Sequence, residues 1–243
     1  MSLLQTPRRL VARAKRTEDP ALRLLLLHGT GAAHSLRRGH RVRRAAVERY
    51  LAGSAEPKLH FGAGPIVLEG WLNSDLIGGD VHLNVERPLP LPSGAFAYAF
   101  GEHVVEHLAE VALPRFFSEL HRVLRPGGVL RLTTPDLRKL IALYEDRNPE
   151  IELARYSAWL GEQTGKDESQ PAQVFNDLMR LWGHRHIFDE PELAARLRAA
   201  GFGDVQRREP LESPHAALRG LERHGGDEWV NRAEAMTLEA TRG

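Results

Sequence analysis

A short apolar segment that ends in a Gly-X-Gly turn places the strongest constraint on how this chain can fold. Residues 59–61 are followed directly by Gly62, Ala63 and Gly64. Glycine tolerates a positive φ, and because it has no Cβ it lets a ligand approach the backbone closely. A strand that ends in such a turn is typical of α/β sheets that bind nucleotide-type cofactors. We therefore expect a strand at residues 58–61 with a ligand site at its carboxyl end.

The dinucleotide-binding fingerprint Gly-X-Gly-X-X-Gly is incomplete in this chain. Val67 stands at the position of the third glycine. An acidic residue, Asp75, follows the turn much earlier than the usual distance of about 20 residues. These two differences disfavour NAD but remain compatible with another cofactor that carries a nucleoside.

Composition excludes several classes of function. The 243 residues include 33 basic and 32 acidic side chains, so the net charge predicts no nucleic-acid partner. The absence of cysteine excludes disulfides, thiolate metal sites and cysteine nucleophiles. The longest apolar run near the start, residues 24–27, is too short for a membrane span or a signal-peptide core. We expect a soluble cytoplasmic protein, and the sequence does not indicate its oligomeric state.

The first 55 residues are rich in basic side chains and differ from the rest. We expect residues 1–55 to form a basic, helical appendage with a helix over residues 40–51, and residues 56–243 to form the main domain. The basic side chains either lie on a solvated helical face or contact an anionic partner. They are Arg8, Arg9, Arg13, Lys15, Arg16, Arg37, Arg38, Arg41, Arg43 and Arg44.

From residue 58 onward, short apolar segments alternate with helical ones, a pattern typical of a layered α/β sheet. Strands are predicted at 58–61, 71–76, 81–85, 95–100, 129–133, 204–208 and 235–241. Helices are predicted at 104–108, at 114–124, from 136 to about 144 and from 188 to a stop at Gly201. Pro126, Gly127 and Gly128 predict a turn before the strand at 129–133. Residues 147–183 are polar and helical, and we expect them to form a lid over the carboxyl edge of the sheet.

Eight motifs, taken in order, resemble a class I S-adenosylmethionine-dependent methyltransferase, and most closely its small bacterial branch with undefined substrates. The resemblance covers residues 58–242. The motifs lie at residues 59–64, 71–75, 89–96, 102–108, 124–128, 134–136, 182–189 and 200–202. This resemblance implies a Rossmann-like, seven-stranded, mostly parallel sheet flanked by helices, with the last strand antiparallel.

The resemblance also implies which residues hold S-adenosylmethionine. Phe61 and Leu76 would line the cofactor pocket, and the turn formed by Gly62, Ala63 and Gly64 would approach the methionine part of the cofactor. Asp75 would accept hydrogen bonds from the ribose, for which a carboxylate is chemically suited. Asn84 and Val85 would flank the adenine, and Gly101 or Glu102 would line the pocket after the fourth strand. No metal ligand is assigned.

The implied reaction is methyl transfer to an oxygen or nitrogen atom of a small molecule or saccharide. Aligning the acceptor with the methyl group supplies much of the acceleration in such a displacement. A hydroxyl acceptor also benefits from a base. The candidates for this role are His103, His107, His184 and His186, although each of them could instead be a packed structural histidine.

Two other functions remain open. Many relatives have acidic residues at the positions of Asn84 and Ala97, so the chain could be a non-catalytic binding or scaffold protein with the methyltransferase fold. In addition, residues 103–107 match His-X-X-Glu-His, the inverted zinc-peptidase motif, in which His103, Glu106 and His107 would share one helical face. The proline and glycine motifs on either side favour the methyltransferase over this zinc hydrolase.

Overall fold

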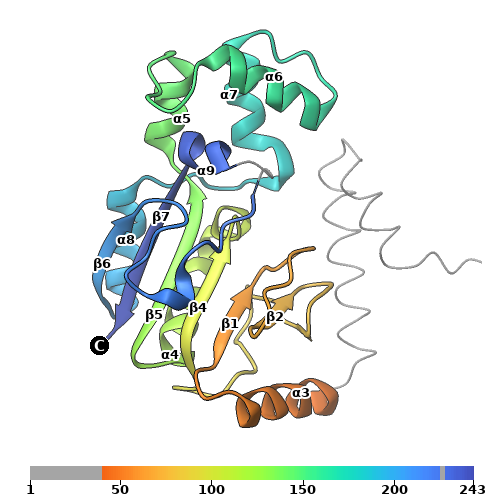
Figure 1. The fold of residues 1–243 in the computed structure, drawn as a ribbon, viewed down its shortest axis with the longest axis vertical. Coiled ribbons are helices and arrows are strands. Elements are labelled where there is room, and N and C mark those ends of the chain that lie inside the picture. The colour runs from red at the N-terminus through yellow and green to blue at the C-terminus, as the bar shows by residue number, and fades with distance from the viewer. Residues whose placement is uncertain (1–39, 225–227) are drawn as a thin grey trace, which may run out of the picture.

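In the residues that the computed structural model describes, 40–224 and 228–243, seven strands form one mixed sheet (Figure 1). The strand order is β3-β2-β1-β4-β5-β7-β6. β7 is antiparallel to both of its neighbours, β5 and β6, while the other neighbouring pairs are parallel. The strands are β1 (Lys58–Phe61), β2 (Leu72–Asp75), β3 (Val81–His82), β4 (Phe96–Glu102), β5 (Leu124–Pro135), β6 (Phe202–Arg208) and β7 (Ala235–Arg242). The predicted Rossmann-like sheet with an antiparallel last strand is confirmed.

The helices begin and end at residues that carry the expected signals. Asp136 caps α5 by accepting from the backbone N–H of Arg138, and Asp189 caps α8 by accepting from that of Glu192, both at 3.0 Å. The α-helices are α3 (His40–Gly53), α4 (Leu113–Val123), α5 (Leu137–Tyr144), α6 (Leu153–Thr164), α7 (Pro171–Arg180), α8 (Glu190–Ala199) and α9 (Glu228–Glu234). Single 3-10 turns are η1 (Val105–His107), η2 (Glu110–Ala112), η3 (Leu181–Gly183) and η4 (Ala216–Leu218). The helix predicted at 104–108 is therefore only the short turn η1.

One face of the sheet is covered by helices with apolar stripes. α4 buries Leu113, Phe116, Phe117, Leu120 and Val123 in the main core, because these positions recur at helical spacing. α8 contributes to the same core, as does Val47 of α3. The predicted turn at residues 125–128 forms a bulge at the start of β5, since Phe96 and Tyr98 of β4 pair with Leu124 and Val129.

The connection between β1 and β2 contains no helix. Residues 62–71 span it, although a parallel crossover normally needs a dozen or more residues and a helix. The buried amide of Asn73 holds this loop instead. It accepts from the backbone N–H of Leu68 at 2.9 Å and donates to the carbonyl of Leu68 at 3.0 Å. The second face of the sheet therefore lacks the helix that a usual crossover would supply.

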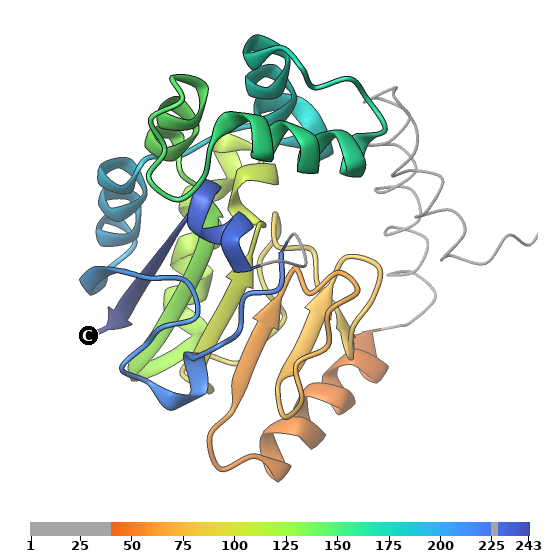
Figure 2. The ribbon, with the colours of Figure 1, turned by 45° about the horizontal axis from the view of Figure 1, so that its top comes forward.

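The chain between β6 and β7 covers much of that second face (Figure 2). From this connection, Leu218 and Leu221 pack against Trp71 and Phe100 in a separate apolar cluster. In the figure this connection runs in front of β4 and β5 before it turns up into α9. The connection between β6 and β7 thus covers the face that a helix between β1 and β2 would normally cover.

A buried arginine fixes this connection to the sheet. Arg131, in the middle of β5, is fully buried. Its guanidinium donates to Glu222 at 2.7 Å, to Glu239 at 2.8 Å and to the carbonyl of Glu212 at 2.8 Å. Because an unpaired buried charge is costly, this network specifies where residues 209–222 lie.

The predicted lid is helical and contains no strand in residues 147–183. Its helices α6 and α7 pack with α5 and α9 around a second apolar cluster that includes Tyr156, Trp159 and Val230. This helical layer lies beyond the carboxyl ends of β4 and β5 (Figure 1).

Most of the expected N-terminal appendage, residues 1–39, lies outside the described residues. The helix predicted at 40–51 is confirmed as α3, and its Tyr50 hydroxyl donates to the carbonyls of Lys58 and Gly70 at 2.9 and 3.0 Å. α3 is therefore tied to β1 and to the β1–β2 loop, and the boundary at residue 55 stays a prediction. None of the helices in the described part of the chain is both long and apolar enough to cross a membrane.

Removing Arg131 tests its structural role. We expect Arg131→Met to lower the free energy of unfolding by about 3–5 kcal/mol, because Glu222 would stay buried without a cation and Glu239 would keep only its ion pair with Arg208. Urea denaturation followed by circular dichroism measures the change. The control is Arg44→Met, which removes an exposed ion pair with Glu48 and should cost less than about 1 kcal/mol. Equal losses in the two variants would contradict this account.

Candidate functional site

The glycine turn and Asp75 meet at the carboxyl edge of the sheet, where the neighbouring parallel strands β1 and β2 end. Gly62 and Gly64 have positive φ values of 64° and 54°. The backbone N–H of Gly64 donates to Asp75 Oδ2 at 2.9 Å, and Ile77 donates to Oδ1 at 3.1 Å. Asp75 thus orders the turn and still has acceptor capacity for a ligand, because a carboxylate has about four lone-pair sites.

The glycine turn also touches the segment after β4. A Cβ at Gly62 would lie 2.3 Å from Cγ2 of Val104, so only glycine fits beneath this side chain. Val104 directly follows His103, the first of the candidate histidines. The turn expected to hold the cofactor and the segment that carries the histidines are therefore in direct contact.

Two residues predicted to line the cofactor pocket pack against each other in the core. Phe61 is fully buried and contacts Phe116 edge-on, with ring centroids 5.4 Å apart. A Cβ at Gly101 would lie 2.0 Å from the Phe61 ring, so this position requires glycine for packing. In this structure, Phe61 and Gly101 support the carboxyl edge of the sheet by packing in the core.

The remaining predicted cofactor residues lie around the same edge. Ala63 is buried, and Leu76 is half-buried directly after β2. Asn84 and Val85 follow β3, where Asn84 Oδ1 accepts from the backbone N–H of Glu86 at 2.9 Å. Val85 packs on the main core. The roles of these four residues in cofactor binding stay predictions.

Glu102 ends β4 and holds the C-terminal connection. Its carboxylate accepts from the backbone N–H groups of Arg223 and His224, with shortest distances of 2.9 and 3.0 Å. The side-chain amide of Asn231 donates to it at 3.2 Å. The residue predicted to line the cofactor pocket is thus engaged with residues more than 100 positions later in the chain.

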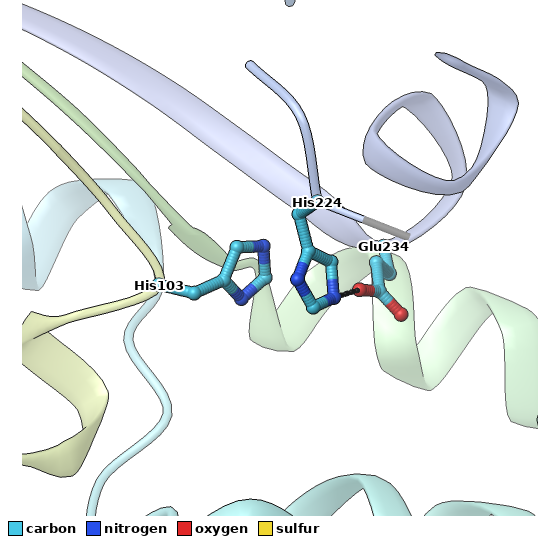
Figure 3. Close-up of side chains that lie close together, drawn as sticks. All are labelled: His103, His224 and Glu234. Carbon is cyan, nitrogen blue, oxygen red and sulfur yellow. Dashed lines mark ion pairs between the residues drawn. The ribbon is translucent and has the colours of Figure 1, made fainter. Parts of the chain in front are cut away.

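His103 lies directly after β4, and His224 lies between it and the carboxylate of Glu234 (Figure 3). The φ of His103 is 51°, and its Nδ1 is 3.1 Å from Glu106 Oε1. The His224 ring stacks on it at a centroid distance of 3.7 Å, and His224 Nε2 is 3.3 Å from Glu234 Oε1. Glu234 in turn accepts from the hydroxyl of Tyr156 in the lid layer.

Glu106 is the centre of a second group of side chains. It is fully buried, and its Oε2 accepts from the hydroxyl of Thr134 at 3.0 Å. His107 Nε2 is 3.9 Å from Glu106 Oε1. The His107 ring meets that of His184 edge to face, at a centroid distance of 4.9 Å.

The charges of these groups follow from burial and from their neighbours. Burial acts to lower the pKa of His103, but the contact with Glu106 and the nearby charges of Glu106, Glu234 and Glu102 outweigh it and raise the pKa to about 9. Burial would raise the pKa of Glu106, yet His103 holds it at about 2. Burial lowers the pKa of His107 to about 4 and also lowers that of His184. At neutral pH, a His103 cation therefore faces a Glu106 anion, beside two neutral imidazoles.

His186, the fourth candidate histidine, lies outside this arrangement. Its Nε2 is 2.9 Å from Glu192 Oε2, and its ring lies 4.4 Å from that of Phe188. The structure therefore brings together His103, His107 and His184 but not His186.

A cavity of about 50 Å³ opens between these histidines and the lid. Its lining residues are His103, His107, Pro135, Leu140, Leu178, Trp182, His184, His224 and Glu234. Two of them, His103 and Trp182, have positive φ values of 51° and 60°, a strained backbone that non-glycine residues keep mainly at functional sites.

Sequence reasoning did not identify His224 or Glu234 as site residues. Both come from the connection between β6 and β7, and no motif or spacing relates them to residues 103–107. Their contact depends on the path of the chain across the sheet.

The His-X-X-Glu-His hypothesis requires a helix that the structure does not form. Residues 105–107 make one 3-10 turn, and His103 has a positive φ. His103 and His107 consequently belong to different groups, one with His224 and one with His184. This geometry does not support the two-histidine zinc site of a hydrolase.

The engagement of Glu102 can be tested by hydrogen exchange. We expect Glu102→Ala to speed amide exchange at Arg223 and His224 by at least about 10-fold, because a hydrogen bond to a charged group contributes about 1.5–3 kcal/mol. Mass spectrometry of peptides that cover these residues measures the effect. Glu69→Ala, which changes an exposed acidic residue in the β1–β2 loop, is the control. Unchanged exchange in Glu102→Ala would show that this carboxylate does not hold the connection.

Comparison with known proteins agrees with the fold. Residues 71–132, from just before β2 into β5, match the family model described as a methyltransferase domain. No curated protein sequence matches the chain.

Solved structures resemble the chain at low sequence identity. A methyltransferase from Thermotoga maritima, described as a possible histamine N-methyltransferase, is 16% identical, with 96% of this chain and 100% of that chain covered and a TM-score of 0.43. An S-adenosylmethionine-dependent methyltransferase from Archaeoglobus fulgidus is 18% identical, with coverages of 83% and 91% and a TM-score of 0.46. An N1-methyltransferase from Burkholderia thailandensis, with bound 1,6-didemethyltoxoflavin and S-adenosylhomocysteine, is 15% identical, with coverages of 100% and 92% and a TM-score of 0.41.

The family match spans β2, β3, β4 and most of β5, and the antiparallel β7 completes the arrangement that the motifs imply. Residues 71–132 therefore match a methyltransferase domain, within a sheet that has the arrangement the motifs imply.

Proposed function

We propose that this protein transfers the methyl group of S-adenosylmethionine to an oxygen or nitrogen atom of a small molecule or saccharide whose reacting group enters the histidine-lined cavity. The observation that carries the proposal is the contact between Gly62 and Val104. It joins the turn suited to the cofactor to the segment that carries His103 and His107. A cytoplasmic location stays part of this proposal.

The cofactor would lie along the carboxyl edge of β1 to β4. Gly62, Ala63 and Gly64 would approach its methionine part, and Asp75 would accept from the ribose hydroxyls with the lone pairs that Gly64 and Ile77 leave free. Asn84 and Val85 would flank the adenine. Glu102 contributes by holding Arg223 and His224 in place.

The reaction is an in-line displacement in which the acceptor lone pair attacks the methyl carbon. The C–S bond breaks, its electron pair stays on sulfur, and S-adenosylhomocysteine leaves. A hydroxyl acceptor also gives up its proton, and the neutral imidazoles of His107 and His184 line the cavity where that proton would be taken up, whereas His103 is already protonated. A cavity of about 50 Å³ has room for a single functional group or a few water molecules. A saccharide would therefore need a displacement of the lid around Trp182.

Asp75 is the sharpest test of the cofactor site. We expect Asp75→Ala to weaken the binding of S-adenosylmethionine and S-adenosylhomocysteine by about 10- to 100-fold, because hydrogen bonds to a carboxylate contribute about 1.5–3 kcal/mol. Isothermal titration calorimetry measures the affinity, and circular dichroism checks the fold. Glu69→Ala is the matched control and should bind normally. An unchanged affinity in Asp75→Ala would remove this residue from the site.

Turnover separates the enzyme from a scaffold. Incubation with S-adenosylmethionine and a panel of hydroxyl and amine acceptors should release S-adenosylhomocysteine, measured by chromatography. Cofactor binding without turnover for any acceptor would favour the non-catalytic alternative. Lack of binding at millimolar cofactor would overturn the proposal.

A further inference from the structure

We propose that Glu106, His107 and His184 form a binding site for a divalent transition-metal ion beside the cavity. Each residue offers one ligand atom, and these atoms lie within 4.8 Å of one another. Two imidazoles and one carboxylate form a donor set typical of first-row transition metals, because imidazole suits zinc, iron and nickel, whereas magnesium and calcium prefer oxygen ligands.

Backbone groups already hold both imidazoles. His184 Nδ1 lies 2.7 Å from the carbonyl of Leu178. When Nδ1 carries the proton and donates to this carbonyl, Nε2 is unprotonated and its lone pair is available to a metal ion. His107 hydrogen-bonds to the backbone of Gly183, and its Nε2 is the nitrogen that faces Glu106. Metal-ligating histidines commonly have one ring nitrogen fixed in this way, which sets the tautomer and orients the other.

One oxygen of the Glu106 carboxylate has acceptor capacity left for a metal ion. Glu106 is fully buried, and Oε2 accepts from Thr134. Oε1 makes no well-aligned hydrogen bond among the described residues; it faces His103 Nδ1, its ion-pair partner, at 3.1 Å and His107 Nε2 at 3.9 Å. A carboxylate has about four lone-pair sites, so Oε1 keeps acceptor capacity beyond the ion pair, and a metal ion is one partner that would use it.

The three ligands are brought together by backbone contacts between two distant segments. The carbonyl of Glu106 accepts from the backbone N–H groups of Arg185 and His186, at 2.7 and 3.2 Å. These bonds fasten the η1 turn to the segment directly after residues 147–183, which carries His184. The three donors therefore lie within 4.8 Å of one another without an ion, and metal bonds of about 2.1 Å would draw them together by roughly 1 Å.

The neighbouring group of His103, His224 and Glu234 is less suited to a metal ion. Its two rings are stacked with an interplanar angle of 23°. Because the lone pair of an imidazole nitrogen lies in the ring plane, stacked rings direct their lone pairs in parallel rather than toward one ion. The edge-to-face rings of His107 and His184, at 64°, are better placed to converge.

An ion with three protein ligands keeps an open coordination position. His107 and His184 both line the cavity, so this position would face it. A hydroxyl acceptor held there would lose its proton more readily. This consequence rests on the proposed function, whereas the metal site itself does not.

Metal titration of the full chain tests the site. The protein is stripped with a chelator and titrated with Zn²⁺ by calorimetry and with Co²⁺ by visible absorption. We expect one ion per chain and d–d absorption typical of bound Co²⁺. His184→Ala and His107→Ala should weaken affinity by at least about 100-fold, because loss of a group that merely orients a ligand already costs about 10- to 100-fold. His186→Ala, two residues from His184, should bind the ions normally.

Several results would overturn the proposal. These are no binding of Zn²⁺ or Co²⁺ by the folded protein, normal binding in His184→Ala, or loss of binding in His224→Ala but not in His184→Ala. Circular dichroism reports whether each variant folds, and His184→Gln replaces His184→Ala where the latter does not. Calorimetry with S-adenosylhomocysteine on the same samples distinguishes the two proposals: cofactor binding without metal binding overturns only the metal site, and the reverse result overturns only the proposed function.

Discussion

The buried guanidinium of Arg131 is the interaction on which the arrangement of this protein most depends. The short β1–β2 loop supplies no helix to one face of the sheet, so another part of the chain must cover it. Arg131 selects that part by pairing with Glu222 and Glu239 at 2.7 and 2.8 Å. Because each of these charges would be costly to bury alone, the connection between β6 and β7 has one favourable path across the sheet. That path ends at Glu102, which holds Arg223 and His224 at the carboxyl edge.

A second buried charge, Glu106, organises the candidate site in a similar way. Its carboxylate stabilises the cationic form of His103, and its carbonyl ties the η1 turn to the segment directly after residues 147–183. The cavity is therefore bounded by groups whose positions depend on one residue. The proposed methyl transfer and the proposed metal site depend on different contacts: the first needs the contact between Gly62 and Val104, and the second needs the donors of Glu106, His107 and His184 close together.

Local sequence patterns predicted most of the helices and strands, because these elements depend mainly on residues that are close together in the sequence. The strand at residues 58–61, the amphipathic helix α4 and the caps Asp136 and Asp189 all arise from short-range signals. Where a helix is predicted at residues 104–108, the structure forms only a 3-10 turn, because His103 has a positive φ and Val104 packs on Gly62. Tertiary contacts of this kind override local helical preference, and a periodic pattern alone does not reveal them.

The sequence by itself determined that the glycine turn and Asp75 share one edge of a sheet, since both end strands of a parallel pair. It also determined that histidines follow the fourth strand. Only the tertiary structure decided that Glu102 would hold the C-terminal connection and that His224 and Glu234 would join His103. The physical reason is that these partners lie more than 100 residues apart in the chain. They meet because buried charges fix the path of the intervening segment, and sequence spacing does not encode that path.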